Sequence, residues 1–217
     1  MAEEKIVAAE TVKEQEVGLE ERQEIVVKME KPYLFEGKEY SEIDLTGLHN
    51  MTIKDAIETQ RQLFGEQEVA AAVLCETTTA FARSIATKAT GLPIEFFKLA
   101  PRGVMKRVSA AVRGFLNVDS STENHVMHLE KVNYYKGKGY QEIDLGGIAD
   151  LNAMNESEAE NRMVREGFVV TENSTNYLYA CVIASMATGI PEDFFTGLPL
   201  YEVLKLKNAV NDPDFFE

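Results

Sequence analysis

The pattern of apolar and polar residues in this chain repeats after 100 residues. Residues 30–48, EKPYLFEGKEYSEIDLTGL, recur over 130–148 as EKVNYYKGKGYQEIDLGGI, with 10 of 19 positions identical. A second block, ATGLPIEFFKL from Ala89, recurs as ATGIPEDFFTGL after a shift of 98 residues. Short-period solenoid repeats span only about 20 to 50 residues. The repeat therefore predicts two tandem copies of one small domain.

Each copy opens with the pattern of a β-hairpin. In the first copy, residues 33–35 lead into a turn in which Gly37 can adopt the positive φ that tight turns require. Tyr40 and Ile43 follow in the return strand, and because they are three residues apart, strict alternation fails between them. We expect a β-bulge or an early strand end at this place. Since a two-stranded hairpin is not stable alone, helices must cover it.

Helical patterns follow the hairpin. Thr52 is placed to cap a helix, with Asp55 three residues later in the acidic position of a capping box. Apolar residues at three-to-four spacing predict a longer helix over residues 66–90, which Gly91 ends. A short helix with paired phenylalanines and a last helix complete the unit. Each copy is thus expected to be a hairpin followed by about four helices.

The second copy diverges most over residues 149–175, where the sequence is more polar. This predicts a shorter first helix and a long helix that begins near Ser174. The fold class expected for the whole chain is α+β, mostly α, with two tandem copies of a small domain. The predicted boundaries are an acidic N-terminal arm over 1–28, a first unit over 29–116, a linker over 117–128 and a second, diverged unit over 129–217.

The net charge of the chain limits the classes of molecule that the protein can bind. The 217 residues carry a net charge of −14, which repels nucleic-acid phosphates and anionic lipid, so we expect neither as a partner. No apolar run approaches the roughly 20 residues needed to span a bilayer. The first 30 residues hold nine glutamates against four basic residues, whereas a signal peptide would begin with basic residues. We expect a cytoplasmic protein.

Basic residues cluster only in the last helix of the first unit, and the second unit has just two lysines at this place. In so acidic a chain, we expect them to pair with the N-terminal glutamates or with the other unit rather than with nucleic acid. They are Arg102, Lys106, Arg107 and Arg113 in the first unit, and Lys205 and Lys207 in the second.

The titratable residues give little sign of catalysis or metal binding. His125 and His128 are three residues apart in the predicted linker with no cysteine nearby, which is a weak metal pattern, and His49 lacks a recognisable nucleophile motif. We read Cys75 and Cys181 as buried thiols. The sequence therefore predicts no enzyme, no catalytic residue, no metal site and no cofactor.

The repeated turn does not resemble a phosphate-binding loop. Gly37-Lys38 and its counterpart Gly137-Lys138 lie inside a hairpin, without the helix that such a loop requires. The repeated strand carboxylates alternate with Ile and Leu, so they are expected on the solvated face, where the two aspartates can also cap the following turn. These carboxylates are Glu42, Asp44, Glu142 and Asp144.

Two motifs together resemble a known family. The opening KPYLFEGKEYSEIDL and the later TGLPIEFFKL, with a terminal helix closing on Phe-Leu, look like the small tail assembly chaperones of long-tailed bacteriophages. The resemblance covers residues 31–116 and, more weakly, 131–216. Members commonly have one unit, so the duplication and the acidic arm are departures from the family pattern.

The resemblance implies a helix-rich protein without enzymatic activity. Such chaperones self-associate and coat the tape measure protein in the cytoplasm of the infected bacterium, until tail tube subunits replace them. The protein would then be absent from the mature virion. Many members are made as a short form and a frameshifted long form, and this chain could be either product. The second hypothesis is a structural virion subunit, such as a tail or neck component.

A chaperone for a long amphipathic helix needs a charged exterior and an apolar groove. Aromatic and methionine side chains at helical spacing supply candidates for that groove, although the same spacing is typical of a hydrophobic core. The candidates are Phe81, Phe96, Phe97, Met105 and Val108 in the first unit, and Met186, Phe194, Phe195 and Leu204 in the second.

Overall fold

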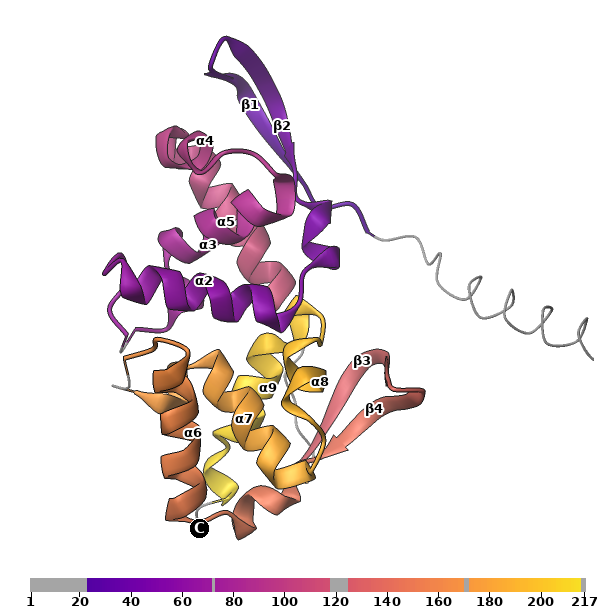
Figure 1. The fold of residues 1–217 in the computed structure, drawn as a ribbon. Helices are drawn as coiled ribbons and strands as arrows, with labels where there is room; N and C mark the ends of the chain where they lie inside the picture. Colours follow the sequence, from indigo (N-terminus) through magenta and orange to yellow (C-terminus); the bar gives the residue numbers. More distant parts are fainter. Residues whose placement is uncertain (1–22, 72, 118–124, 170–171, 216–217) are drawn as a thin grey trace, which may run out of the picture.

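The computed structural model describes residues 23–71, 73–117, 125–169 and 172–215 (Figure 1). Most of the predicted arm (1–22) and of the predicted linker (118–124) lies outside these ranges. The first unit runs through β1 (Val26–Phe35), β2 (Lys38–Asp44), the 3-10 turn η1 (Thr46–Asn50), α2 (Ile53–Gly65), η2 (Cys75–Thr77), α3 (Thr79–Thr90), α4 (Ile94–Leu99) and α5 (Arg102–Leu116).

The second unit repeats this order. Its elements are β3 (Val126–Tyr135), β4 (Lys138–Asp144), η3 (Gly146–Asp150), α6 (Ala153–Arg165), η4 (Asn173–Thr175), α7 (Tyr177–Thr188), α8 (Glu192–Thr196), η5 (Leu200–Glu202), α9 (Val203–Val210) and η6 (Pro213–Phe215). The prediction of a mostly helical α+β fold built from two repeated units is confirmed.

Each hairpin turns over two residues with positive φ. These are Glu36 and Gly37 in the first unit, at 48° and 80°, a geometry that matches the twist of the flanking strands. The expected bulge is present, but its extra residues are on the first strand: Lys28 pairs with Glu42 and Tyr33 pairs with Tyr40, so residues 29–32 face a single residue. The second hairpin has the same irregularity.

The first strands begin earlier than predicted. β1 begins at Val26 and β3 at Val126, so residues 26–28 and 126–128 belong to the hairpins rather than to the arm and the linker. Backbone pairing extends to this point because Leu45 N donates to the Ile25 carbonyl at 2.7 Å.

The helix predicted over residues 66–90 is only partly correct. α2 begins after Thr52 as predicted, and Asp55 closes the capping box by accepting from Thr52 N at 2.9 Å. However, α3 begins only at Thr79. Gln67 has a φ of 57°, which breaks the helix, and the Thr78 hydroxyl accepts from Phe81 N at 3.1 Å as a new N-cap. Gly91 ends α3 in the left-handed conformation, as expected.

The prediction of a shorter first helix in the second unit is wrong, because α6 has 13 residues, as many as α2. Its polar sequence reflects exposure instead: only Ala159 and Met163 of α6 are buried. The helix is supported by its Asn152 cap and by an ion pair between Arg162 and Glu166, one turn apart. α7 begins at Tyr177, close to the predicted start.

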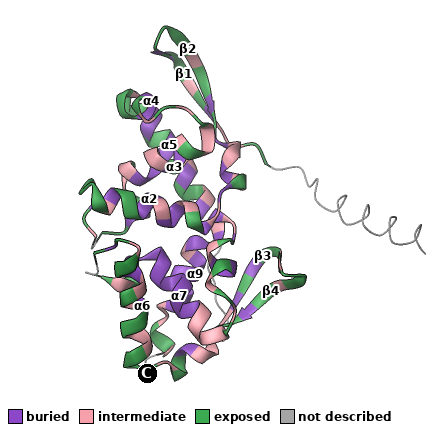
Figure 2. Cartoon of the chain, in the orientation of Figure 1, coloured by how far each residue is buried: buried purple, intermediate pink, exposed green. Residues whose placement is uncertain are grey.

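Buried side chains from both units form one core (Figure 2). The helices of the two units pack against each other, while the hairpins project outward from them (Figure 1). α7 is the most enclosed helix, with every residue from Tyr177 to Ala184 buried. Within the described ranges, no helix is long and apolar enough to cross a membrane.

Candidate functional site

Seven of the nine predicted groove residues belong to the core. Their exposed fractions are at most 7%, whereas Met186 and Leu204 are half-buried. This placement agrees with the alternative interpretation of their spacing, and a client could reach the seven side chains only if the fold opened. The seven are Phe81, Phe96, Phe97, Met105, Val108, Phe194 and Phe195.

The paired phenylalanines hold each hairpin against its helices. Around Phe96 of α4, the rings of Tyr33, Phe35 and Tyr40 lie with centroids 4.9, 5.3 and 4.8 Å away. The Tyr33 hydroxyl also donates to the Phe96 carbonyl at 3.1 Å. These contacts supply the cover that an isolated hairpin needs.

The two repeated motifs meet in space. Gly47, at the end of the hairpin motif, lies so close to the Ala89 carbonyl that an added Cβ would overlap its oxygen. Gly147 has the same relation to the Ala187 carbonyl in the second unit. Both glycines are therefore required by the close approach of a helix end. The motif pair defines how each unit is assembled.

The repeated strand carboxylates have the predicted structural role. Glu42 and Asp44 are exposed, as are their counterparts. The Asp44 Oδ1 accepts from Thr46 N at 2.8 Å, and hydrogen bonds from the side chain and the backbone of Thr46 lower the pKa of Asp44. Asp144 accepts in the same way from Gly146 N at 2.8 Å.

Equivalent basic residues anchor the bulge of each hairpin. Arg107 donates to the Lys28 carbonyl at 2.8 Å and also pairs with Glu30. Its counterpart, Lys205, donates to the His128 carbonyl at 2.8 Å. Part of the predicted pairing of basic residues with N-terminal glutamates is thus confirmed at Glu30.

A buried polar network joins the two units. Glu76 of the first unit accepts a hydrogen bond from the Tyr177 hydroxyl at 2.8 Å and forms an ion pair with Lys207. The amide of Gln60 donates to the Thr175 carbonyl at 2.8 Å and accepts from Tyr177 N at 3.0 Å. Lys207 of the second unit therefore pairs with Glu76 of the first. This is the second kind of pairing that was expected for the basic residues, namely pairing with the other unit.

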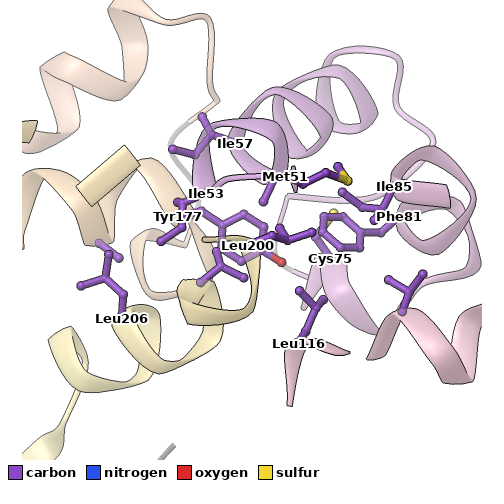
Figure 3. Close-up of a cluster of buried hydrophobic side chains, with 14 of the residues drawn as sticks. Met51, Ile53, Ile57, Cys75, Phe81, Ile85, Leu116, Tyr177, Leu200 and Leu206 are labelled. Atoms are coloured by element: carbon purple, nitrogen blue, oxygen red, sulfur yellow. The ribbon is translucent and has the colours of Figure 1, made fainter. Parts of the chain in front are cut away.

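The network is enclosed by apolar side chains. In Figure 3, Tyr177 lies among Ile53, Phe81 and Leu200, which come from both units. Burial raises the pKa of the Tyr177 phenol well above its ordinary value and that of the neighbouring Cys75 thiol to about 12. Both groups stay protonated at neutral pH, so neither is a ready nucleophile.

The cysteines and histidines make contacts that are typical of a structural role. Cys75 and Cys181 are buried free thiols, as predicted. His49 donates through Nε2 to the Gln23 carbonyl at 3.1 Å, and the His125 ring lies 4.3 Å from that of Phe215. Within the part of the chain that the structure describes, no group of three or more His, Cys, Asp or Glu side chains is placed to hold a metal ion.

Exposed apolar residues occur at equivalent places in the two hairpins. Leu34 is 62% exposed and Tyr134, its counterpart, is 78% exposed. Leu34 lies on the face of its hairpin opposite Tyr33 and Phe35, and Tyr134 has the equivalent position between Asn133 and Tyr135. Strand alternation could have identified both from the sequence. In the second hairpin, Val132 adds to this surface across Gly139. Sequence reasoning missed these residues because it looked for the client surface on the helices.

The free edge of the second hairpin borders an open groove. Residues 138–144 of β4 form one wall, Thr188 and Ile190 form the other, and the groove has a volume of about 540 Å³. A strand with one neighbour leaves half of its backbone donors and acceptors unpaired along its outer edge. The groove is therefore a second place where a chain segment can lie against this hairpin.

Comparisons with protein-family models, curated protein sequences and solved structures gave no match to this chain.

Proposed function

We propose that this protein is a tail assembly chaperone of a long-tailed bacteriophage, which binds and solubilises the tape measure protein during tail morphogenesis. The observation that carries the proposal is the pair of motifs, KPYLFEGKEYSEIDL and TGLPIEFFKL, in one unit. The two motifs are in direct contact, because the Tyr33 hydroxyl donates to the Phe96 carbonyl at 3.1 Å and the Phe35 ring lies 5.3 Å from that of Phe96, so they belong to one structural unit. This contact gives a physical reason for the two motifs to occur together.

The surface proposed to bind the client is the outer face of the hairpins, around Leu34 in the first and Tyr134 in the second. Single exposed apolar residues are common on soluble proteins. Here they recur at matching positions of two hairpins that project from different places on the molecule (Figure 1), so each could hold a separate segment of one amphipathic client. The net charge of −14 would keep such a complex in solution.

Co-expression with a helical fragment of the tape measure protein from the same phage tests the proposal. The fragment should move from the insoluble to the soluble fraction and co-purify with the chain. If its solubility is unchanged and nothing co-purifies, the proposal fails. Mass spectrometry of purified virions provides a second test: a chaperone should be absent, whereas a stoichiometric amount would favour a structural subunit.

A pair of variants tests the hairpin surface. Leu34→Asp with Tyr134→Asp should abolish co-purification, because it places charge in the apolar contact. Thr79→Asp with Ser157→Asp adds the same charge to exposed polar positions on α3 and α6, outside the hairpins, and should leave binding intact. Equal binding by both double variants would place the client elsewhere on the protein.

A further inference from the structure

The two units meet through two different faces, one from each unit. Both faces are buried, and each unit contributes a different part of the shared architecture, so the contact is heterologous, or head-to-tail. The face of the first unit, here called the α2 face, consists of Met51, Ile53 and Gln60. The face of the second unit, here called the η5 face, consists of Thr175, Leu198 and Leu200.

Main-chain hydrogen bonds join the α2 face to the η5 face. Ile53 N donates to the Leu198 carbonyl at 2.9 Å, and Leu200 N donates to the Met51 carbonyl at 2.9 Å. The two segments thereby form a short antiparallel bridge between Thr52 and Pro199. Because these bonds use the main chain, they depend on its conformation rather than on the side chains at these positions.

Each unit also carries the counterpart of the face that the other unit uses. The residues of both counterparts are exposed or half-buried, so both surfaces are accessible to solvent. On the second unit, at a shift of 100 residues, the counterpart of the α2 face is the α6 face, which consists of Leu151, Ala153 and Glu160. On the first unit, at a shift of 98 residues, the counterpart of the η5 face is the α5 face, which consists of Thr77, Ala100 and Arg102.

The main chain has the same conformation in the free faces as in the paired ones. Thr52 has φ and ψ of −120° and 172°, and its counterpart Asn152 has −131° and 176°. Pro199 has −52° and 146°, and its counterpart Pro101 has −51° and 140°. The α6 and α5 faces can therefore form the same bridge that joins the α2 and η5 faces.

The side chains of the free faces differ from those of the paired faces in a complementary way. The α5 side gains positive charge and the α6 side gains negative charge, and opposite charges favour association of two surfaces. On the α5 side, Arg102 and Lys106 stand where the second unit has Leu200 and Leu204. On the α6 side, Glu156 and Glu160 stand where the first unit has Ala56 and Gln60.

Both glutamates make one contact inside their own unit. Glu156 accepts from the Tyr179 hydroxyl at 2.6 Å, and Glu160 accepts from the Asn173 side chain at 3.1 Å. A carboxylate has two oxygens and accepts several hydrogen bonds, so these contacts leave room for a basic partner.

The α6 face and the α5 face of one chain are too far apart to meet. The end of α6 lies beside the first unit, where Glu166 is 3.2 Å from Arg61. Ala153 begins the helix thirteen residues earlier, about 20 Å from that point. In Figure 1, the start of α6 and helix α4, which leads into Ala100, lie at opposite ends of the molecule. The α6 face can therefore reach an α5 face only in another copy.

We propose that the α6 face of one chain docks on the α5 face of a second copy, in the same way that the α2 face docks on the η5 face within the chain. Ala153 N then donates to the Ala100 carbonyl, and Arg102 N donates to the Leu151 carbonyl. The basic side chains of the α5 face lie against the acidic side chains of α6. Because the contact is heterologous, each added copy leaves one face of each kind free. The hairpins lie outside both faces, so this proposal does not depend on the chaperone function.

Sedimentation equilibrium of the full-length chain tests the association. At low salt, the average mass should rise above the chain mass of 24.3 kDa as the protein concentration increases. At 1 M salt, where the Debye length is about 3 Å, the association should weaken, because charged side chains contribute to the contact. A mass that stays at 24.3 kDa at every concentration in low salt would overturn the proposal.

Two variants each block one face. Arg102→Glu with Lys106→Glu reverses the charge of the α5 face, and Ala153→Arg places a long basic side chain on the α6 face. Each variant should stay monomeric, while its thermal unfolding shows that it is folded. The matched control is Lys31→Glu with Lys54→Glu, which makes the same charge change at exposed positions outside both faces and should associate like the wild type.

A mixture of the two blocked variants tests the head-to-tail geometry. Ala153→Arg retains an intact α5 face, and the double glutamate variant retains an intact α6 face. Their equimolar mixture should therefore form a dimer with one copy of each variant, and no larger species. Association of either variant alone at the wild-type level, or a mixture that stays monomeric, would overturn the proposed contact.

Discussion

Glu202 is a carboxyl group that the fold encloses completely. It is 0% exposed, accepts from Glu130 N at 2.7 Å and lies 3.4 Å from the Lys205 ammonium. Its counterpart in the first unit is Val104, so the architecture does not demand a charge at this position. Burial outweighs these favourable contacts and raises the pKa of Glu202 above its ordinary value of 4.5.

This raised pKa predicts a pH dependence of stability. Because the folded chain binds the proton more tightly than the unfolded chain, the stability that Glu202 contributes is fully present below pH 4.5 and is lost as pH rises through the folded pKa. The unfolding free energy of the wild type relative to Glu202→Gln should therefore fall as pH rises from 4.5 towards neutrality. Urea unfolding at several pH values measures this difference.

The matched control is Glu158→Gln, which removes the same charge from an exposed position on α6. Subtracting its effect corrects for the change in net charge. A difference between wild type and Glu202→Gln that is constant with pH, or that grows as pH rises, would contradict the assignment.

At the scale of the elements, the contact between the hairpin motif and the end of α3 is the most constrained. An Ala at position 47 would push its Cβ into the Ala89 carbonyl, which belongs to a capped helix end and cannot move easily. Overpacking of this kind costs about 1 to 3 kcal/mol. The same reasoning applies to Gly147 and Ala187.

Gly47→Ala should therefore lower the free energy of unfolding by about 1 to 3 kcal/mol, measured by urea unfolding. Gly114, inside α5, provides the contrast, because an added Cβ there meets nothing within 4 Å. Gly114→Ala should raise stability by about 0.5 to 1 kcal/mol, since glycine is costly inside a helix. If Gly47→Ala left stability unchanged or raised it, the close approach at Gly47 would be refuted.

The sequence predicted those elements that depend on local residues. The hairpin turn, the bulge, the Thr52 cap and the end of α3 all follow from one or two residues with strong backbone preferences. The start of α3 was missed because helical spacing continues through residues 66–78, although the Thr78 hydroxyl forms a competing local hydrogen bond. The length of α6 was predicted wrongly because its polar sequence was interpreted as a loss of helix, whereas it reflects a helix that is exposed.

The candidate site was harder to predict for a physical reason. Spacing shows that Phe96 and Phe194 share a face with other apolar residues, but it does not show whether that face meets a client or another part of the same chain. The network of Gln60 and Glu76 could not be predicted for a related reason, because their hydrogen-bond partners are more than 100 residues away along the sequence. Only tertiary packing brings these groups together.

For the whole molecule, the buried pair between Glu76 and Lys207 couples the two units. Removing one member of a buried ion pair leaves the other charge uncompensated, which typically costs about 3 to 5 kcal/mol. Lys207→Met should therefore lower the unfolding free energy by about this amount, measured by urea unfolding. Arg61→Met, which removes an exposed ion pair with Glu166 between the same units, should cost only about 0.2 to 1 kcal/mol.

Hydrogen exchange can show whether the units unfold together. In Lys207→Met, amides of α3 and α7 should lose the same amount of protection, because both helices pack into one core. A loss confined to α7 would mean that the units open separately. Equal costs for Lys207→Met and Arg61→Met would contradict the importance of the buried pair.

The shared core also has a consequence for biosynthesis. Gln60 is translated 115 residues before Thr175, the residue whose carbonyl it binds. At a translation rate of about 5 to 20 residues per second, on the order of 6 to 23 seconds pass between the synthesis of α2 and the synthesis of the residues that cover its buried face. During this interval Gln60 and Glu76 lack their partners, and the adjoining apolar face is open to water. A nascent chain stalled after the first unit would thus leave this apolar face uncovered.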